Sequence, residues 1–528
     1  MIIFVWLAAA VAAVYLYLKQ VYSHFSRYGV KHKEPTLLLG DMADVLLRKR
    51  HMVDLLKDAY FGFPTERFVG RYEFTKPSII MRDTDLLKKI AVKDFEYFLD
   101  HGLSVIQDID PLFGRILFSL YGQEWKDMRS TLSPAFTSSK IKNMIPFIVE
   151  VGDQMLASLK KQLKESEKDY IDVDVKDIGT RYANDVIASC AFGLRVDSYS
   201  DPDNTFYKYA HQSINFNFKQ ILTFFGYSMF PFLMKQLGIT LFSENIRDFY
   251  MNMVKDTMKN RDAHNIIRPD MIHLLMEAKK GKLTHTETDK DADAGFATVE
   301  ESDVGKKSIS RVWTDIDLTA QVVVFLRAGF ETVSTALTFL LYELAFHPEI
   351  QDRLAQEIKV HEKKTGGKLE YHNIQNMVYL DMVISEILRL WPPAIATDRL
   401  CIKDYNLGKP NEHASKDYII KAGEIITIPL TAIHRDPKNY PDPDKFDPER
   451  FSEENTHKIQ TYMPFGLGPR NCIGSRFALV ELKVMIYQIL LNMEVSPCEK
   501  TPVPAELQTG TFSLRLKGGH HLRMGPRK

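Results

Sequence analysis

The chain has 528 residues with 68 basic and 68 acidic side chains, so its formal net charge is zero and nothing in its charge points to nucleic acid as a partner. The length allows two or three ordinary domains, yet no internal repeat or Gly/Ser-rich linker divides it, so one large catalytic unit is also allowed. The four cysteines form neither CxxC pairs nor a dense framework, which favours a reducing compartment over a secreted protein held by disulfides. Their spacing is also not that of a zinc site.

The first eighteen residues are apolar and carry no charged side chain, and basic residues follow from Lys19 onward. This segment is near the lower length limit for crossing a bilayer, and the basic residues after it place the rest of the chain on the cytosolic side. A cleaved signal peptide is the alternative, although no basic stretch precedes the apolar run and no small-x-small site closes it. We expect a transmembrane anchor at 1–18, a linker at 19–48 and a catalytic domain at 49–528.

The rest of the sequence is predominantly helical by its hydrophobic spacing. Amphipathic stretches predict helices around 143–163, 245–260 and 374–390, and short β-branched stretches predict strands at 76–82 and 424–430. The segment 281–308 is polar and charged, which predicts a surface loop. These patterns indicate a mainly α fold with a small β region.

Two stretches raise alternatives that the residues alone leave open. Trp125 and Arg129 lie one helical turn apart, so both can donate hydrogen bonds to one anionic group, or they form a stacked pair on the surface. Residues 216–242 contain eight phenylalanines or tyrosines and few charges. This aromatic stretch either packs in the core, or lines an apolar channel and contacts a bilayer.

The longest predicted helix runs from about Thr314 to Phe346. Thr314 and Asp317 resemble a capping box, and His347-Pro348 predicts the end. Such a helix is roughly 50 Å long. It is apolar enough to resemble a second membrane span, but its charged residues argue against that: Arg327, Glu331 and Glu343.

The middle of this helix carries the sequence AGFET, residues 328–332. Gly329 in a helix interior costs about 1 kcal/mol relative to alanine, which predicts a close neighbour or a local opening there. Thr332 lies one turn after Ala328 on the same face. A threonine in such a place is more often structural than functional.

Near the C-terminus, Cys472 is surrounded by residues that a buried structural cysteine does not need. Gly466, Gly468 and Gly474 allow the backbone to lie flat against a large planar group, and Pro469 stiffens the loop. Arg470 adds a cation that lowers a thiol pKa and can bind an acidic group, and a predicted helix N-terminus follows the cysteine. A haem held by the cysteine sulfur and by arginine accounts for all these residues.

The pattern Phe465-x-x-Gly468-x-Arg470-x-Cys472-x-Gly474 resembles the haem-binding signature of the cytochromes P450, which use a cysteine thiolate as the proximal ligand. The resemblance covers nearly the whole chain and is greatest to microsomal enzymes of animals that oxidise foreign compounds, in the insect detoxification branch. It implies a single large haem domain behind an N-terminal anchor, with haem b as cofactor.

The resemblance also implies roles for individual residues. Cys472 is the axial ligand of the haem iron, and Thr332 with Glu331 helps deliver protons on the distal side. The haem propionates are held by Trp125, Arg129, Arg399 and Arg470, and the other cofactor-binding residues are Ala328, Phe465, Gly468 and Gly474. A buried structural network consists of Glu386, Arg389 and Arg450, although an isolated i, i+3 pair such as the first two is usually a weak surface contact.

The activity implied is insertion of one oxygen atom from O2 into lipophilic substrates, in xenobiotic detoxification. The electrons must come from outside, because the sequence has no GxGxxG fingerprint for flavin or nicotinamide. The implied partners are NADPH–cytochrome P450 reductase and, as an additional donor, cytochrome b5, at the cytosolic face of the endoplasmic reticulum membrane. Two alternatives stay open: a haem-thiolate isomerase or dehydratase, and a haem-binding sensor.

Arg327 departs from the apolar residue expected before AGFET in this family. A guanidinium keeps its charge, so its burial requires a nearby acceptor. Because Glu331 lies one turn further on nearly the same side of the helix, we expect Arg327 to point away from the haem and to pair with Glu331 or another nearby acceptor. The alternative is that Arg327 reaches solvent through a water-filled channel.

Overall fold

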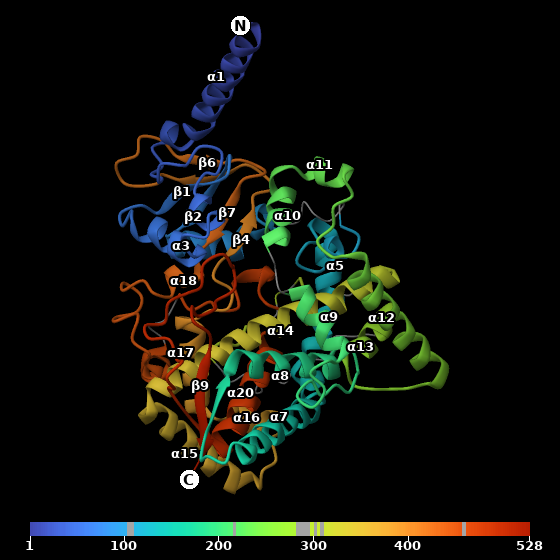
Figure 1. Ribbon diagram of the computed structural model, residues 1–528. Helices are drawn as coiled ribbons and strands as arrows, with labels where there is room; N and C mark the ends of the chain where they lie inside the picture. The colour runs from blue at the N-terminus through green and yellow to red at the C-terminus, as the bar shows by residue number, and fades with distance from the viewer. Residues whose placement is uncertain are drawn as a thin grey trace. The chain divides into compact units, whose positions relative to one another are not determined.

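The protein is described by a computed structural model covering residues 1–102, 110–214, 218–280, 296–299, 302, 304–306, 311–456 and 461–527. These residues form two compact units. The first unit comprises Met1–Gly102, Ala394–Asn439 and Gln508–Phe512, and the second comprises Leu103–Pro393, Tyr440–Leu507 and Ser513–Lys528 (Figure 1). The surface loop predicted at 281–308 lies largely outside the described residues.

The first unit contains a four-stranded sheet in the order β1-β2-β7-β4. Its strands are β1 (Phe68–Glu73), β2 (Lys76–Met81), β4 (Thr397–Leu400) and β7 (Ile425–Ile428). β2 and β7 are parallel, and the other pairs are antiparallel. The two strands predicted at 76–82 and 424–430 are confirmed, and the structure shows that they are neighbours in this sheet.

Shorter elements complete the first unit. Its helices are α1 (Ile2–Tyr22), α2 (Ala43–Leu46), α3 (Met52–Phe61), α4 (Thr84–Lys88) and α18 (Leu430–Ile433), and β5 (Tyr405–Gly408) pairs with β6 (Tyr418–Ile420). α3 and α18 pack together, and the Tyr60 hydroxyl of α3 donates a hydrogen bond to the Asp436 carboxylate at 2.9 Å.

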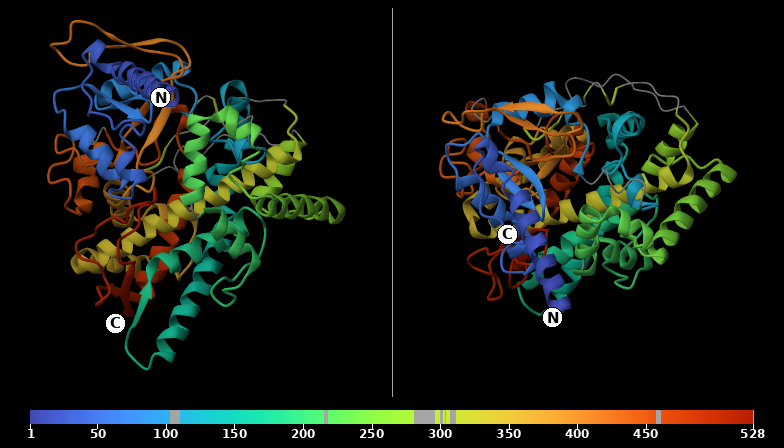
Figure 2. Two further views of the ribbon diagram at one scale, coloured as in Figure 1. Left: turned by 45° about the horizontal axis from the view of Figure 1, so that its top comes forward. Right: turned by 90° about the horizontal axis from the view of Figure 1, so that it is seen from above.

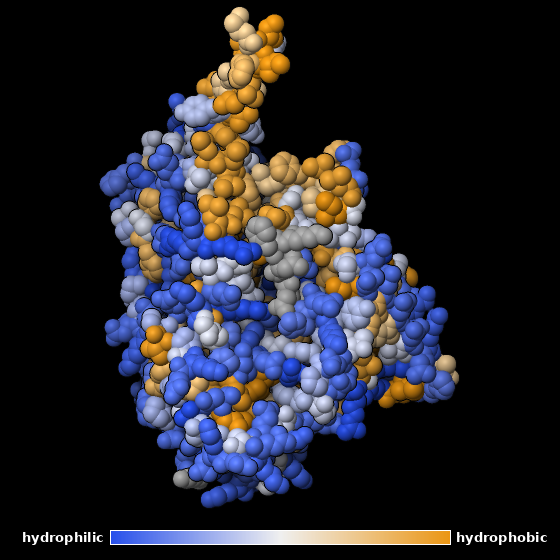
Figure 3. Space-filling model, in the orientation of Figure 1, coloured by the Kyte–Doolittle hydropathy of each residue, from blue (hydrophilic) through white to orange (hydrophobic). Residues whose placement is uncertain are grey.

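The N-terminal helix α1 is apolar and almost wholly exposed, as the orange surface in Figure 3 shows. It continues past residue 18 and includes Lys19. The following residues pack on the sheet: Phe25 is fully buried, and a Cβ on Gly70 of β1 would lie 2.5 Å from its ring. The segment predicted as a linker thus contributes to the core of the first unit.

Helices dominate the second unit, and its longest are grouped around α14 (Figure 2). The long helices are α7 (Ile145–Glu165), α8 (Val175–Cys190), α12 (Glu244–His264), α14 (Asp315–Phe346), α15 (Pro348–Thr365), α17 (Val378–Leu390) and α20 (Ser475–Asn492). The shorter helices are α5 (Gly122–Leu132), α6 (Ser138–Lys142), α9 (Thr205–Ile214), α10 (Phe218–Met229), α11 (Pro231–Gln236), α13 (Met271–Lys279), α16 (Tyr371–Gln375) and α19 (Glu453–Thr456).

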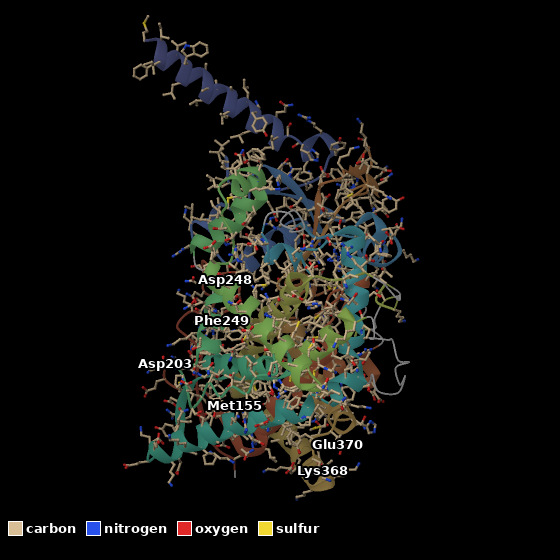
Figure 4. The ribbon with its side chains drawn as sticks, turned by 90° about the vertical axis from the view of Figure 1, so that its right-hand side faces the viewer. Met155, Asp203, Asp248, Phe249, Lys368 and Glu370 are labelled. Carbon is tan, nitrogen blue, oxygen red and sulfur yellow. The ribbon has the colours of Figure 1, made fainter. Side chains whose placement is uncertain are left out.

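A three-stranded antiparallel sheet in the order β3-β9-β8 also belongs to the second unit. Its strands are β3 (Ile171–Asp174), β8 (Met493–Ser496) and β9 (His521–Pro526). Figure 4 views the helices of this unit from the side, with Met155 labelled on α7 and Phe249 on α12, where Phe249 stacks on Tyr209 of α9 at 4.2 Å between ring centroids.

α14 is the central helix of the second unit. The predicted capping box is present, because the Thr314 hydroxyl accepts from the Asp317 N–H and the Asp317 carboxylate accepts from the Thr314 N–H. Two described helices, α1 and α14, are long and apolar enough to cross a membrane, but 67% of the α14 segment is buried inside the protein. α14 is therefore a core helix, as its charged residues predicted.

Two details of the helices refine the predictions. Gly329 faces Ile187 of α8, whose Cδ1 atom would lie 2.7 Å from an added Cβ, so the predicted close neighbour exists. The helix predicted at 374–390 is instead two helices, α16 and α17. A new helix begins at Val378 because the Glu357 carboxylate of α15 accepts the N–H groups of Tyr379 and Leu380, each at 2.9 Å.

Candidate functional site

The loop that carries Cys472 is a closed turn just before α20. The Cys472 N–H donates to the Phe465 carbonyl at 2.8 Å, which closes the loop on itself. Gly466 and Gly468 have φ angles of 79° and 72°, in the left-handed region that side chains rarely adopt. Gly474 is the N-cap of α20, and its φ angle of −94° is one that other residues also adopt. The property of Gly474 that matters in this loop is therefore its small size.

The Cys472 thiol is accessible and forms no disulfide, yet it is surrounded by protein. Burial raises the pKa of the thiol, while the Gly474 N–H and the Arg129 cation lower it. The cation that acts on the thiol is therefore Arg129, whereas the sequence suggested Arg470. An accessible sulfur within the protein, beside a cation, an N–H donor and a helix N-terminus, suits a thiolate ligand.

Arg129 and Arg470 join α5 to the Cys472 loop. Arg129, on α5, donates to the carbonyl of Asn471 at 2.8 Å and to its side-chain oxygen at 2.7 Å. Arg470 donates to the Leu120 carbonyl at 2.8 Å, and its guanidinium lies 3.9 Å from the centroid of the Trp125 ring. Two permanent cations thus lie close to the cysteine.

Trp125 and Arg129 are not a surface pair, because only 1% of Trp125 and 2% of Arg129 are exposed. Among the described residues, no protein atom accepts a hydrogen bond from the Trp125 indole N–H. A buried donor of this kind normally has a partner. The structure therefore brings Trp125, Arg129 and Arg470 together as predicted, with a donor left for an anionic group.

The middle of α14 has an unusual exposure pattern. Most of the helix is buried, but Ala328 and Thr332, one turn apart on the same face, are exposed. The Thr332 hydroxyl donates back to the Ala328 carbonyl. Small and polar residues on an open face of a core helix leave room for a ligand beside them.

Of the acceptors expected for Arg327, which were Glu331 or another nearby group, the structure has the second. Arg327 donates to the Ser213 carbonyl at 2.7 Å and lies over the rings of Phe113 and Phe242 at 5.5 and 5.1 Å. Burial lowers the pKa of Arg327 to about 10, although Tyr250 and Asp110 oppose the change. The expectation of another nearby acceptor is met, because a carbonyl on α9 is in reach.

Glu331 has two other cationic partners. Its Oε1 atom lies 3.3 Å from the Lys176 Nζ atom of α8 and 3.7 Å from an Arg515 guanidinium nitrogen. The sequence carried no signal for either contact, because both cations are remote from Glu331 in the chain and meet it only through packing.

Glu386, Arg389 and Arg450 form the buried network that was predicted. The Arg389 guanidinium donates to both carboxylate oxygens of Glu386, at 2.6 and 2.8 Å, and the Arg450 Nε atom lies 3.4 Å from the same carboxylate. Glu386 and Arg389 are fully buried. Burial raises the pKa of Glu386, while Arg389 and the Asp447 N–H lower it.

Arg399 belongs to the first unit and lies on β4, where it is 2% exposed. Burial lowers the pKa of Arg399 to about 10, and Asp398 opposes the shift. The Asp398 carboxylate accepts from the His101 ring at 2.8 Å and from the Gly102 N–H at 2.6 Å. The His101–Asp398 pair beside Arg399 was not predicted.

Comparison with known proteins decides the family. The Cytochrome P450 family model matches residues 61–523. The chain belongs to the cytochrome P450 family. It is 43% identical to cytochrome P450 9e2 of Blattella germanica, over 97% of this chain and 96% of that protein. It is 40% identical to probable cytochrome P450 9f2 of Drosophila melanogaster (99% and 98% covered) and 36% identical to cytochrome P450 6k1 of B. germanica (97% and 95% covered).

These relatives confirm the predicted resemblance to insect P450 enzymes. Proteins of the P450 family are monooxygenases that bind haem b, so this chain is an oxidoreductase of that class with haem b as its cofactor. The family also implies an external redox partner and a lipophilic substrate. The apolar, exposed α1 is consistent with the membrane anchor of microsomal P450 enzymes.

The residues present fit a haem. The accessible Cys472 sulfur suits the iron, and the buried Trp125 indole with the two arginines suits a propionate. The open Ala328–Thr332 face suits the distal side of a flat ring. Each of these P450 features is on the second unit.

The aromatic stretch 216–242 turns out to be divided. Tyr227 and Phe242 are buried, which is core packing. On and around α11, Phe230, Phe232 and Leu237 are between 59% and 71% exposed. The most exposed apolar residues that the structure describes in this stretch are therefore gathered on and around α11.

Proposed function

We propose that this P450 is a haem-thiolate monooxygenase that hydroxylates lipophilic foreign compounds at the cytosolic face of the endoplasmic reticulum, with electrons from NADPH–cytochrome P450 reductase. The observation that carries the proposal is the accessible Cys472 sulfur, positioned by the Gly474 N–H at the start of α20. When bound, haem supplies the activation of O2, in a reaction that uses two electrons and two protons and yields a hydroxylated product and water.

In this proposal the residues have separate tasks. Cys472 binds the iron as a thiolate, and Arg129 and the Gly474 N–H stabilise its negative charge. Trp125, Arg129, Arg470 and Arg399 bind the propionates. Phe465, Gly468 and Gly474 shape the proximal loop, and Ala328 keeps the distal face open. The structural network of Glu386, Arg389 and Arg450 stabilises the second unit.

Proton supply is assigned to α14. The Thr332 hydroxyl, which donates to the Ala328 carbonyl, is on the open face of the helix, and Glu331 precedes it in the chain. A hydroxyl donates one proton while accepting another, so Thr332 can pass protons without changing its charge.

The lipophilic substrate class rests on two apolar surfaces, each exposed on its own unit. α1 carries exposed residues such as Phe4, Trp6 and Leu7, and α11 carries Phe232 and Leu233. Surfaces of this kind enter a bilayer, where lipophilic compounds accumulate. By the resemblance to the family, we expect substrate contacts in the regions 101–122, 216–242, 320–332, 394–399 and 510–514, of which residues 103–109 and 216–217 lie outside the described residues.

The deciding experiment is Cys472→Ser, with Cys498→Ser as the matched control because Cys498 is a second, partly accessible cysteine. The reduced, CO-bound wild type and the control should show the red-shifted absorption band of thiolate ligation, and Cys472→Ser should lose it. Retention of the band in Cys472→Ser would assign the ligand to another residue and refute the proposal.

A second experiment tests the proton path. Thr332→Ala should retain haem while the product formed per NADPH consumed falls roughly tenfold, because a general acid–base contribution is lost. Thr338→Ala is the control, since the Thr338 hydroxyl makes the same type of bond, to the Ser334 carbonyl, but is buried. Reductase with NADPH and a panel of alkoxycoumarins provides the assay. A protein that binds haem but consumes no NADPH with any of them would favour the isomerase or sensor alternatives.

A further inference from the structure

A buried lysine contacts the same segment of α14 that carries the proposed proton path. Lys176, in the first turn of α8, has a side chain that is only 10% exposed. Its Nζ atom donates to the Ser334 hydroxyl at 2.9 Å and to the Thr335 hydroxyl at 3.0 Å, and it lies 3.3 Å from Glu331. Glu331 lies within the Ala328–Thr332 segment, and Ser334 and Thr335 follow it within about one turn.

The carboxylate of Glu331 lies between two cations of different kinds. Lys176 approaches it from α8, and Arg515 approaches it from the segment before β9, with 32% of its side chain exposed. Neither hydroxyl partner of Lys176 can neutralise the ammonium, so its charge depends on Glu331.

We propose that Lys176 is a positioning residue of this P450: together with Arg515 it holds the Glu331 carboxylate as an anion on the α8 side of α14, and loss of the Lys176 proton releases it. The inference rests on the proposed function, since it assigns a regulator to the proton path through Glu331 and Thr332. It makes proton delivery dependent on pH through a residue that does not contact substrate or haem.

The charges around Lys176 support a release near physiological pH. Burial and the Arg515 cation lower the pKa of Lys176 while Glu331 and Asp174 oppose the change, and the net result is a pKa of about 8. Asp174 is the N-cap of α8. His520, which faces the same cluster, has its pKa lowered to about 4 by burial and is therefore neutral in this range.

His211 of α9 is the remaining titratable group near this cluster. Burial and the Arg515 cation lower the pKa of His211, so it is neutral at pH 7 and above, while Glu331 and Asp177 act in the opposite direction. Lys176, with a pKa of about 8, therefore changes charge between pH 7 and 9, whereas the His520 and His211 side chains stay neutral. Below about pH 8 Glu331 is held by two cations, and above it by Arg515 alone.

The test compares Lys176→Met and Lys176→Arg with the wild type, as full-length haem-loaded enzymes with reductase and alkoxycoumarins. The measured quantity is product per NADPH between pH 7 and 9. The wild type should lose coupling above about pH 8. Lys176→Met should show at pH 7 the roughly tenfold lower coupling that a lost supporting contact causes. Lys176→Arg keeps its charge, so its coupling should not change with pH.

Lys483→Met is the matched control for loss of a buried lysine. Lys483 is fully buried on α20 and is paired with Asp381 at 2.7 Å and with the Gln375 side chain at 2.8 Å. This variant should be less stable, but its coupling should keep the pH dependence of the wild type. A coupling loss equal to that of Lys176→Met would mean that destabilisation alone explains the effect, which would overturn the inference.

A second measurement needs no turnover. Between about pH 8 and 10.5 the unfolded chain binds a proton at Lys176 that the folded chain does not, so the free energy of unfolding should rise with pH across this range. Lys176→Met should lack this rise in urea titrations. An identical pH dependence in both proteins would refute the charge change at Lys176.

The two proposals fail in different ways. If Thr332→Ala lowers coupling but Lys176→Met matches the wild type, the inference is refuted and the proposed function stands. If Thr332→Ala leaves coupling unchanged, the proton path itself is refuted and the inference fails with it.

Discussion

Two charged clusters of the second unit each contain a carboxylate that is wholly or largely buried, but they differ in how closely cations pair with it. Glu386 is fully buried and makes a bidentate pair with Arg389, with donor–acceptor distances of 2.6 and 2.8 Å. Glu331 is 17% exposed and has its cations at 3.3 and 3.7 Å. The first cluster therefore has one stable arrangement, whereas the second can lose a partner without leaving a fully buried charge.

This difference in pairing distinguishes charged residues that stabilise the fold from those that can regulate activity. Arg389 also donates to the carbonyls of Pro443 and Lys445, so nearly every donor in that network has a partner. Lys176 has hydroxyls as its remaining partners, and these can accept a hydrogen bond from a charged or from a neutral amine. A close, saturated network resists change, and a looser one near its titration point responds to pH.

The largest expected effect on stability is that of a substitution at Glu386. Glu386→Gln should lower the free energy of unfolding by about 3–5 kcal/mol, because it leaves the Arg389 charge buried without its anion. Glu449→Gln is the control, since Glu449 pairs with Arg353 on the surface, and it should cost less than about 1 kcal/mol. Urea titrations of the haem-loaded proteins give both values. Equal small effects would show that the Glu386 network adds no stability.

A buried carboxyl without a partner extends the comparison. Glu481 of α20 is fully buried, and neither of its carboxylate oxygens accepts a hydrogen bond from the described residues. Glu481→Leu should raise the free energy of unfolding by about 1–3 kcal/mol at neutral pH, because an unsatisfied polar group is removed. Glu494→Leu, at an exposed position of β8, is the control and should change little.

The effect at Glu481 should depend on pH. Burial raises the pKa of the Glu481 carboxyl well above its usual 4.5, so the folded chain keeps a proton that the unfolded chain releases. The stability of the wild type should then fall as the pH rises above about 4.5, while Glu481→Leu should not show this loss. Parallel pH profiles of the two proteins would contradict a protonated Glu481.

The looser cluster depends on how closely α8 approaches α14. Gly329→Ala should cost about 1 kcal/mol, since crowding against the Ile187 side chain outweighs the gain in helix propensity. The double variant Gly329→Ala with Ile187→Val should recover part of this loss, measured as a double-mutant cycle from unfolding curves. A stabilised Gly329→Ala protein would mean that the two helices have room between them.

The smallest effect is expected at Arg515. Arg515→Gln should change the free energy of unfolding by less than about 1 kcal/mol, because this guanidinium is partly exposed and 3.7 Å from Glu331. The loss should shrink further in high salt, since exposed ion pairs are screened. If Arg515→Gln lowered the free energy of unfolding as much as Glu386→Gln does, the two clusters would not differ in how strongly their ion pairs contribute to stability.

Much of this site was predictable because its signals are local. The turn at Gly466 and Gly468, the helix after Cys472 and the capping box at Thr314 each depend on residues a few positions apart, and the structure has all three. Helical spacing also suggested Glu331 as one of the acceptors for Arg327, but an acceptor in the structure is the Ser213 carbonyl of another helix, at 2.7 Å. Helical spacing states which residues share a face, but not what packs against that face.

The resemblance to the P450 family, the loop that carries Cys472 and the course of α14 could all be inferred from the sequence, because a glycine-rich turn, a helix cap and an apolar period depend on neighbouring residues. Three features became visible only in the folded molecule: Arg129 acts on the Cys472 thiol, the buried Trp125 has an unused indole N–H, and Lys176 contacts Glu331. Those contacts join elements distant in the chain, and their strength depends on burial. Burial is a property of the packed molecule, which no local pattern contains.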